Sequence, residues 1–135
     1  MLTRRGFAAC ALCAVTGFVA TAAEAQSSAT TPGLKRTILQ RTDGPVAGYE
    51  TLVVAVELAP GAMVARHTHP GIESAYVIEG DTELSIDGQP PRRLGPGEGF
   101  QIPVGLPHSA KNFDKTTKIA ATYVVEKGKP LASPA

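Results

Sequence analysis

The stretch "ARHTHPGIESAYVIEG", residues 65–80, places two of the chain's three histidines one residue apart and a glutamate four residues later. Residues i and i+2 of a β-strand point to the same face, so a strand here would present His67 and His69 together. Two neutral imidazoles and the Glu73 carboxylate form a donor set that suits a divalent transition metal. The alternative is a polar strand edge beside a turn at Pro70-Gly71, which needs no metal.

The composition indicates one domain rich in turns. The chain has 135 residues, a formal net charge of +1, 14 glycines, 11 prolines and no tryptophan. Near-neutral charge and scarce aromatic residues argue against a nucleic-acid-binding protein, which usually carries a basic face. Short apolar runs between Gly and Pro favour an all-β fold, and no segment shows sustained helical periodicity.

The expected strands occupy residues 34–127, and residues 128–135 are expected to form a surface tail. Asp87-Gly88 predicts a hairpin turn after one of them. Strands this short and this closely spaced are typical of a sandwich or a barrel. The candidate strands are 34–41, 49–59 (a run that stops at Pro60-Gly61), 62–69, 73–79, 82–88, 99–103, 108–113 and 117–127.

The segment 73–79 is apolar on both faces. Glu73, Ala75 and Val77 alternate with Ser74, Tyr76 and Ile78, so both sides of this strand should be covered. One side can face a barrel interior. The other requires a second sheet or a neighbouring subunit, and we therefore expect a homodimer. The leader, residues 26–33, and the segment Leu34–Arg41 could instead cover part of that face.

The N-terminus is predicted to be a secretion signal with cleavage after Ala25. A basic start is followed by an apolar run and the small-x-small triplet 23–25, and the run is too short and too rich in Ala and Thr for a membrane-spanning helix. "TRRGF", residues 3–7, resembles a twin-arginine export signal, the alternative being an ordinary secretory signal with two arginines. Residues 26–33 would form a flexible leader, and the protein would be periplasmic or secreted, with no membrane attachment after cleavage.

Removal of residues 1–25 would change the composition in two ways. The segment contains Cys10 and Cys13, the only cysteines, so no disulfide or thiolate nucleophile would remain. It also contains two arginines and one glutamate, so the net charge would fall from +1 to zero.

Two ordered motifs resemble the signatures of the cupin family. The first family motif reads Gly, five residues, His-x-His, three or four residues, Glu, six residues, Gly. The second reads Gly, five residues, Pro-x-Gly, two residues, His, three residues, Asn. The matching positions here are Gly61, His67, His69, Glu73 and Gly80, followed by Gly97, Pro103, Gly105, His108 and Asn112.

The resemblance implies a small, single-domain, antiparallel jelly-roll β-barrel. It also implies that His67, His69, Glu73 and His108 converge on one divalent ion, which could be Mn, Fe, Ni, Cu or Zn. Three imidazoles and a carboxylate leave about two positions of an octahedral ion open to water, substrate or dioxygen. Glu73 would be a ligand at rest and a catalytic base when substrate displaces it.

The rest of the chain offers few other catalytic groups. There is no histidine to spare as a base for a serine nucleophile, so any chemistry would run through the metal. Arg66, Arg92 and Arg93 could attract an anionic substrate, although solvated surface charge is the default interpretation. Candidate apolar pocket walls, each of which could equally be ordinary core, are Met63, Val77, Phe100, Ile102, Phe113 and Tyr123.

Three functions fit this sequence. The leading hypothesis is a metal-dependent oxygenase that acts on a small organic molecule, by analogy with the quercetin-dioxygenase-like cupins. The second is a metal-dependent lyase or isomerase that uses the same ligands without dioxygen. The third is a non-catalytic module that binds a metal or a small ligand.

Overall fold

The computed structural model describes residues 31–135, which form ten β-strands in two antiparallel five-stranded sheets. The predicted all-β jelly-roll fold is confirmed. Within these residues, no helix has the length and apolar character needed to cross a membrane. The predicted signal peptide, residues 1–25, and most of the predicted leader lie outside the described residues.

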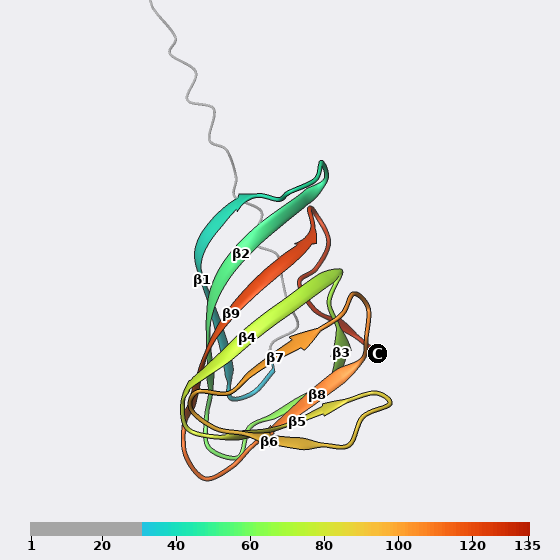
Figure 1. Ribbon diagram of the computed structural model, residues 1–135. Helices are drawn as coiled ribbons and strands as arrows, with labels where there is room; N and C mark the ends of the chain where they lie inside the picture. The colour runs from blue at the N-terminus through green and yellow to red at the C-terminus, as the bar shows by residue number, and fades with distance from the viewer. Residues whose placement is uncertain (1–30) are drawn as a thin grey trace, which may run out of the picture.

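The larger sheet has the strand order β1-β2-β9-β4-β7 and curves around one side of the barrel (Figure 1). Strand β9 lies between β2 and β4, so a strand from the end of the domain fills the centre of the sheet. Its strands are β1 (Leu34–Asp43), β2 (Tyr49–Leu58), β4 (Gly71–Glu79), β7 (Gly99–Ile102) and β9 (Thr117–Glu126).

The smaller sheet has the order β10-β3-β8-β5-β6 and closes the barrel from the other side. Its strands are β3 (Met63–Thr68), β5 (Thr82–Ile86), β6 (Arg92–Leu94), β8 (His108–Asn112) and β10 (Ser133–Pro134). The hairpin predicted at Asp87-Gly88 joins β5 to β6, and the sequence analysis did not identify β6 itself.

Strict alternation in the central strands builds the core. In β2, Leu52, Val54, Val56 and Leu58 are all at most 7% exposed, whereas Val53 between them is 40% exposed. This period of two is what a strand with one buried face requires. The same alternation in β4 and β9 places the interior of the barrel between the two sheets.

Two glycines leave no room for a side chain. At Gly71, a Cβ atom would lie 1.9 Å from the backbone oxygen of Val124 on the neighbouring strand. At Gly80, φ is +76° and a Cβ would lie 2.5 Å from the Thr116 oxygen. Both glycines therefore allow the backbones of β4 and β9 to approach each other at the two ends of β4.

A buried polar cluster fixes the loop between β8 and β9. The Asn112 side chain donates hydrogen bonds to the carbonyl oxygens of Leu58, Ala59 and Lys115, at 2.8–2.9 Å. Its own oxygen accepts a hydrogen bond from Thr117, 2.7 Å away. Every polar atom of this amide has a partner, so the last residue of the second sequence motif has a structural role here.

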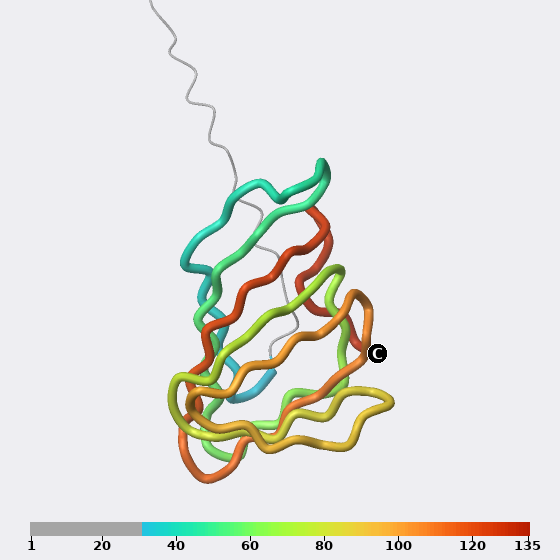
Figure 2. The backbone as a smooth tube through the Cα atoms, in the orientation of Figure 1, coloured from blue at the N-terminus to red at the C-terminus, as the bar shows by residue number. Residues whose placement is uncertain are grey.

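The C-terminal segment contributes more than the expected surface tail. Residues Ser133 and Pro134 form β10 and pair with Thr68 and His67 of β3. Leu131 is only 6% exposed and belongs to the hydrophobic core. Figure 2 shows this end of the chain returning to lie beside β3. The prediction missed β10 because a two-residue strand that contains proline has no periodicity to detect.

The outer face of the larger sheet is apolar and open. The two faces predicted for 73–79 are correct: Glu73, Ala75 and Val77 are buried, while Tyr76 and Ile78 are 51% and 55% exposed. Ile72 and Val53 add to the exposed apolar surface on the same face. Within one copy of the described chain, nothing covers this face.

Candidate metal centre

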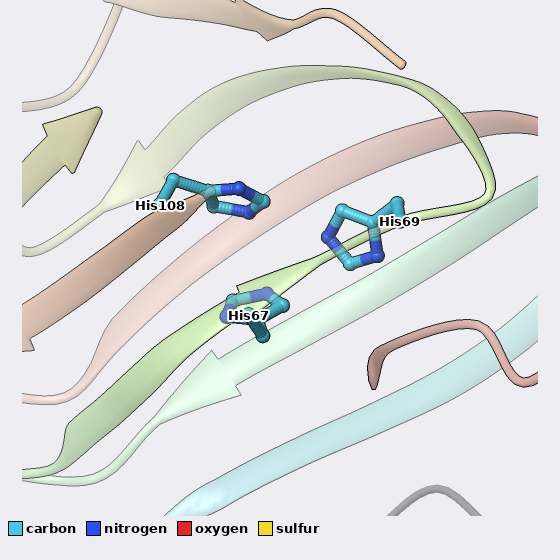
Figure 3. A group of neighbouring side chains, drawn as sticks. All are labelled: His67, His69 and His108. Atoms are coloured by element: carbon cyan, nitrogen blue, oxygen red, sulfur yellow. The ribbon is translucent and has the colours of Figure 1, made fainter. Parts of the chain in front are cut away.

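The fold brings all three histidines to one place inside the barrel. His67 is on β3, His69 directly follows that strand, and His108 is the first residue of β8. His67 and His108 lie opposite each other in the pairing of β3 with β8. The ring centroids are 4.2–5.0 Å apart, and one ring nitrogen of each histidine lies within 4.8 Å of the others. Figure 3 shows the three imidazoles turned toward a common space.

A bulge in β3 turns His67 inward. The register of β3 on β8 shifts between Val64 and His67, so that the two residues between them, Ala65 and Arg66, are both exposed while Val64 and His67 are buried. The same bulge places the Ala65 carbonyl oxygen 2.8 Å from Nδ1 of His67. His67 and His69 therefore share the inward face, as predicted, although the strand that carries His67 is irregular.

The other two histidines are held by carbonyl groups in the same manner. Nδ1 of His108 lies 3.0 Å from the oxygen of Leu106, in the turn that carries Pro103 and Gly105. Nδ1 of His69 lies 2.5 Å from the oxygen of Leu131 in the C-terminal segment. A carbonyl oxygen can only accept, so Nδ1 carries the proton in each ring. The three Nε2 lone pairs are consequently free to act as ligands.

Glu73 approaches the same space from β4. Its Oε2 lies 3.1 Å from Nε2 of His69 and 3.5 Å from Nε2 of His108. Its Oε1 accepts a hydrogen bond of 2.8 Å from the hydroxyl of Tyr123, which lies directly across from Glu73 on β9. The hydroxyl thus fixes the carboxylate with one oxygen pointing at the histidines. The sequence analysis had treated Tyr123 only as a pocket wall.

This donor set requires a cation between its members. The Nε2 atom of His69 is buried and makes no hydrogen bond of acceptable geometry, although the Glu73 oxygen is only 3.1 Å away. With Nδ1 protonated, a lone pair and a carboxylate oxygen face each other there, which is repulsive unless a proton or a metal ion lies between them. Three imidazole nitrogens with one carboxylate oxygen suit a divalent transition metal, so the residues present fit the ion that the resemblance implies.

The environment sets the charge of each group in a way that suits ligation. Burial lowers the pKa of His67 to about 4, despite its hydrogen bond to Ala65, so this imidazole is neutral at physiological pH. Burial by itself would raise the pKa of Glu73, but its close contacts with the His108 and His69 rings and the hydrogen bond from Tyr123 outweigh it and keep the pKa below its usual range. Burial, followed by the charge of Glu73, raises the pKa of Tyr123 well above 10, so the phenol keeps its proton.

The centre opens into a small interior hollow of about 50 Å³ with mostly apolar walls. Phe100 and Tyr123 line it, as predicted, whereas Val77 and Ile102 are fully buried core. Two predicted wall residues are wrong. Met63 is 67% exposed, and Phe113 lies under the guanidinium of Arg93, 4.3 Å from its ring centroid.

The arginines considered from the sequence are surface residues, as their default interpretation held. Arg66 pairs with Asp87, and Arg93 pairs with Asp81. Arg92 is exposed on β6. A different arginine, Arg36 of β1, lines the interior hollow together with His67 and Glu73. The sequence carried a usable indication, because Arg36 alternates with the apolar residues Leu34 and Ile38 in the first strand.

Residues 54–126 match the family model described as Cupin domain, and this span includes the centre. The chain belongs to the cupin family. The three-histidine cluster, inside a barrel of this family, marks a metal-binding site.

Similar proteins of known identity support the assignment. The chain is 35% identical over 72 residues to dimethylsulfoniopropionate lyase DddQ of Ruegeria pomeroyi, covering 53% of this chain and 36% of that protein. It is 34% identical over 90 residues to germin-like protein subfamily T member 3 of Arabidopsis thaliana, covering 58% and 38%. The chain therefore spans well under half of each of these curated relatives.

Solved structures of other proteins resemble this fold as well. The crystal structure of DddQ superposes with a TM-score of 0.59 and 26% identity, over 70% of this chain and 44% of that one. The structure of KdgF from Halomonas sp. superposes with a TM-score of 0.60 and 26% identity, over 71% and 83%.

Proposed function

We propose that this cupin is a metal-dependent enzyme that removes a proton from a small organic molecule, as a lyase or an isomerase does. The observation that carries the proposal is the Glu73–Tyr123 pair. A carboxylate and a protonated phenol lie 2.8 Å apart, directly beside the three inward Nε2 atoms. This is an acid–base pair at a metal site, and its chemistry requires no dioxygen.

The histidines and Glu73 divide the work. His67, His69 and His108 would hold a divalent ion, and such an ion would supply Lewis acidity that makes the C–H bond next to a carbonyl or carboxylate group of the substrate more acidic. Glu73 then accepts the proton from that carbon. In a lyase, the electron pair of the broken C–H bond forms the double bond, and the leaving group departs from the next carbon with its own electron pair.

Tyr123 holds Glu73 in place for this step. Its hydroxyl donates to Oε1, which leaves Oε2 as the oxygen that faces the reacting carbon. The apolar hollow excludes water from the carboxylate, which strengthens it as a base once substrate separates it from the ion. The similarity to a protein named as a dimethylsulfoniopropionate lyase supports this class of reaction.

Proton abstraction can be measured without knowing the natural substrate. We expect the chain, loaded in turn with Fe²⁺, Mn²⁺ or Zn²⁺, to exchange the α-protons of dimethylsulfoniopropionate or related small acids in D₂O, or to release an alkene, as followed by NMR. Glu73→Gln should lower the rate about 100-fold or more, at ion concentrations that keep the site filled. Gln101→Glu, on the outer side of β7, is the control.

An oxygen electrode separates the alternatives. Oxygen uptake without proton exchange would favour the oxygenase predicted from the sequence and contradict the lyase. Neither activity, with a firmly bound ion, would favour the non-catalytic binding module.

We propose further that two copies of the chain associate through the outer face of the larger sheet. The exposed apolar residues of β4 and β2 support this, because single soluble chains rarely expose a continuous apolar face. Light scattering should give a dimer mass, and Ile78→Lys should give a monomer. Val46→Lys, equally exposed but in the β1–β2 turn, should leave the mass unchanged. A wild-type monomer at high micromolar concentration would refute the dimer.

Export to the periplasm is also a proposal, supported by the basic and apolar pattern of residues 1–25. The twin-arginine route carries folded proteins, so it would let the barrel acquire its ion before export. We expect a mature N-terminus near Gln26, and accumulation of the precursor in the cytoplasm when Arg4 and Arg5 are both replaced by lysine. Normal export of that variant would refute the pathway, though not secretion itself.

A further inference from the structure

Arg36 occupies an inward position on β1. It pairs with Val56 of β2, whose side chain is 7% exposed and belongs to the core. Directly opposed residues of antiparallel strands share a face, so Arg36 lies on the inward side of β1, where it is half-buried. A cationic side chain on an apolar inner face needs a specific reason, because its burial is unfavourable unless an anion compensates it.

Arg36 lies where two hollows meet. The inner hollow, about 50 Å³, contains His67, Glu73, His108 and Tyr123. The outer one, about 120 Å³, is bounded by Thr31, Arg66 and the β10 segment. Only Arg36, Val64 and His67 line both of them. Arg36 is therefore the one ionisable side chain besides His67, among the described residues, that borders both hollows.

The guanidinium has no acidic partner among the described residues. Its Nε atom is buried without a hydrogen-bond partner, and Arg36 forms no ion pair with any residue between 31 and 135. Other arginines of the barrel do have acidic partners, as the Arg41–Glu50 pair at 3.2 Å shows. Glu73, the acidic group of the inner hollow, is already engaged by Tyr123.

The positive charge of Arg36 affects the pKa values of two residues of the centre, His67 and Tyr123. Burial is the main cause of the lowered pKa of His67, and the positive charge of Arg36 adds to it. In Tyr123, burial raises the pKa, and Arg36 opposes that rise through its charge and a hydrogen bond. Arg36 also lines the same inner hollow as Glu73 and Tyr123, so the guanidinium belongs to the surroundings of the acid–base pair.

We propose that Arg36 binds the carboxylate of the substrate, which is a small organic acid whose other end reaches the three histidines and Glu73. Guanidinium and carboxylate match in shape and charge and form paired hydrogen bonds, and the buried Nε would gain its missing acceptor. The two small hollows accommodate a short acid and exclude a polymer. The reacting end of this molecule rests on the function proposed above, whereas the carboxylate contact does not.

A matched pair of probes isolates the charge. Propionate and propionamide have the same shape, but only the first is an anion. We would measure the binding of both to the full chain by ligand-observed NMR, once with Zn²⁺ bound and once after removal of metal with a chelator. Propionate should bind about tenfold or more tightly than propionamide in both forms.

Variants assign this preference to one residue. Arg36→Gln should abolish it and leave the zinc content unchanged, and Arg36→Lys should retain part of it. Arg92→Gln, which removes an exposed arginine of β6 that lines neither hollow, should have no effect. A merely structural role for Arg36 would weaken the binding of the acid and the amide alike, and circular dichroism would detect a variant that fails to fold.

The outcomes separate this inference from the proposed function. If Arg36→Gln keeps the preference for propionate, the inference is overturned, because the carboxylate then binds to the ion or elsewhere. If the metal-free chain shows the preference and loses it in Arg36→Gln, the inference stands even where no proton exchange is found. Equal binding of both probes by the folded wild-type chain overturns it as well.

Discussion

Strand β8 is five residues long, and it carries a buried polar side chain at each end. The two side chains differ in how fully their polar atoms are hydrogen-bonded. At its last residue, Asn112 finds a partner for every polar atom: three carbonyl oxygens accept from its amide and Thr117 donates to it. At its first residue, His108 has a carbonyl partner for Nδ1, while its Nε2 faces the Glu73 carboxylate across 3.5 Å.

The difference teaches how to tell structural from functional burial. A saturated cluster stabilises the fold and has no capacity left for a ligand. In the metal centre, the outward atoms all have hydrogen-bond partners: Nδ1 of each histidine and Oε1 of Glu73. We call this the saturated side. The inward atoms, the three Nε2 and Oε2, form the unsaturated side. Its unused lone pairs point at one another, which lowers stability unless a cation binds. A binding site is expected where buried polar atoms without hydrogen-bond partners face a common interior space.

The largest effect should follow from removing a ligand. His108→Ala is expected to weaken binding of Zn²⁺ or Co²⁺ by more than about 100-fold, since even partners of ligands contribute 10- to 100-fold. Competition with a chromophoric chelator measures this affinity. The neighbouring Ser109→Ala should bind the ion normally. If the His108 variant keeps its affinity, the histidine cluster does not hold the metal.

The other end of β8 should show the converse behaviour. Asn112→Ala removes the donor to the carbonyl oxygens of Leu58, Ala59 and Lys115 and an acceptor of the Thr117 hydroxyl, so the free energy of unfolding should fall by about 3 kcal/mol. The folded fraction should still bind metal with normal affinity. Urea denaturation of this variant beside Lys111→Ala, whose side chain is exposed, provides the measurement. A loss of metal affinity in folded Asn112→Ala would contradict the separation of the two ends.

Much of this arrangement could be predicted from the sequence, because spacing determines it. The alternation in residues 49–58 and 73–79 gives the strands and their faces, and the two ordered motifs give the convergence of three histidines that are 41 residues apart at most. Gly80 is the last position of the first motif, and its close approach to Thr116 shows why no side chain fits there.

The missed features depend on contacts that no local pattern records. The carbonyl group of Leu131 is 62 residues from His69, and every residue has such a group, so no residue type indicates its role. The Tyr123 hydroxyl and the Arg36 guanidinium have roles only because β9 and β1 place them beside Glu73 and His67. The sequence showed other arginines nearer to the motifs, and those are surface residues: Arg66 and Arg93 pair with aspartates, and Arg92 is exposed.

The unsaturated inner side should also make the metal-free protein sensitive to acid. The pKa of His67 falls to about 4 in the folded chain from 6.5 in the unfolded one. Between these values the unfolded chain binds more protons, so stability is fully present above pH 6.5 and decreases as the pH falls toward 4. The decrease attributable to His67 is at most about 3 kcal/mol.

Glu73 does not contribute in that window. Its pKa is lowered on folding, so its contribution is present above about pH 4.5, the ordinary value of a glutamate, and is lost only below it. Urea midpoints of the chelator-treated protein between pH 6.5 and 4.5 test the effect, with His67→Asn as the comparison. An equal pH dependence in that variant would assign the sensitivity to other groups.

The smallest effect concerns the outer, saturated side of the histidine cluster. Deletion of residues 131–135 removes the carbonyl oxygen that lies 2.5 Å from Nδ1 of His69, so the ring loses the partner that fixes its protonation and orientation. We expect metal affinity to fall about tenfold. Deletion of 133–135 alone removes β10 and its pairing with β3 but keeps Leu131, which separates the carbonyl group from the strand. If the shorter deletion lowers metal affinity as much as the longer one, the pairing of β10 with β3 positions His69. If only the longer one does, a backbone oxygen from the end of the chain completes the support of a centre whose ligands all come from its middle.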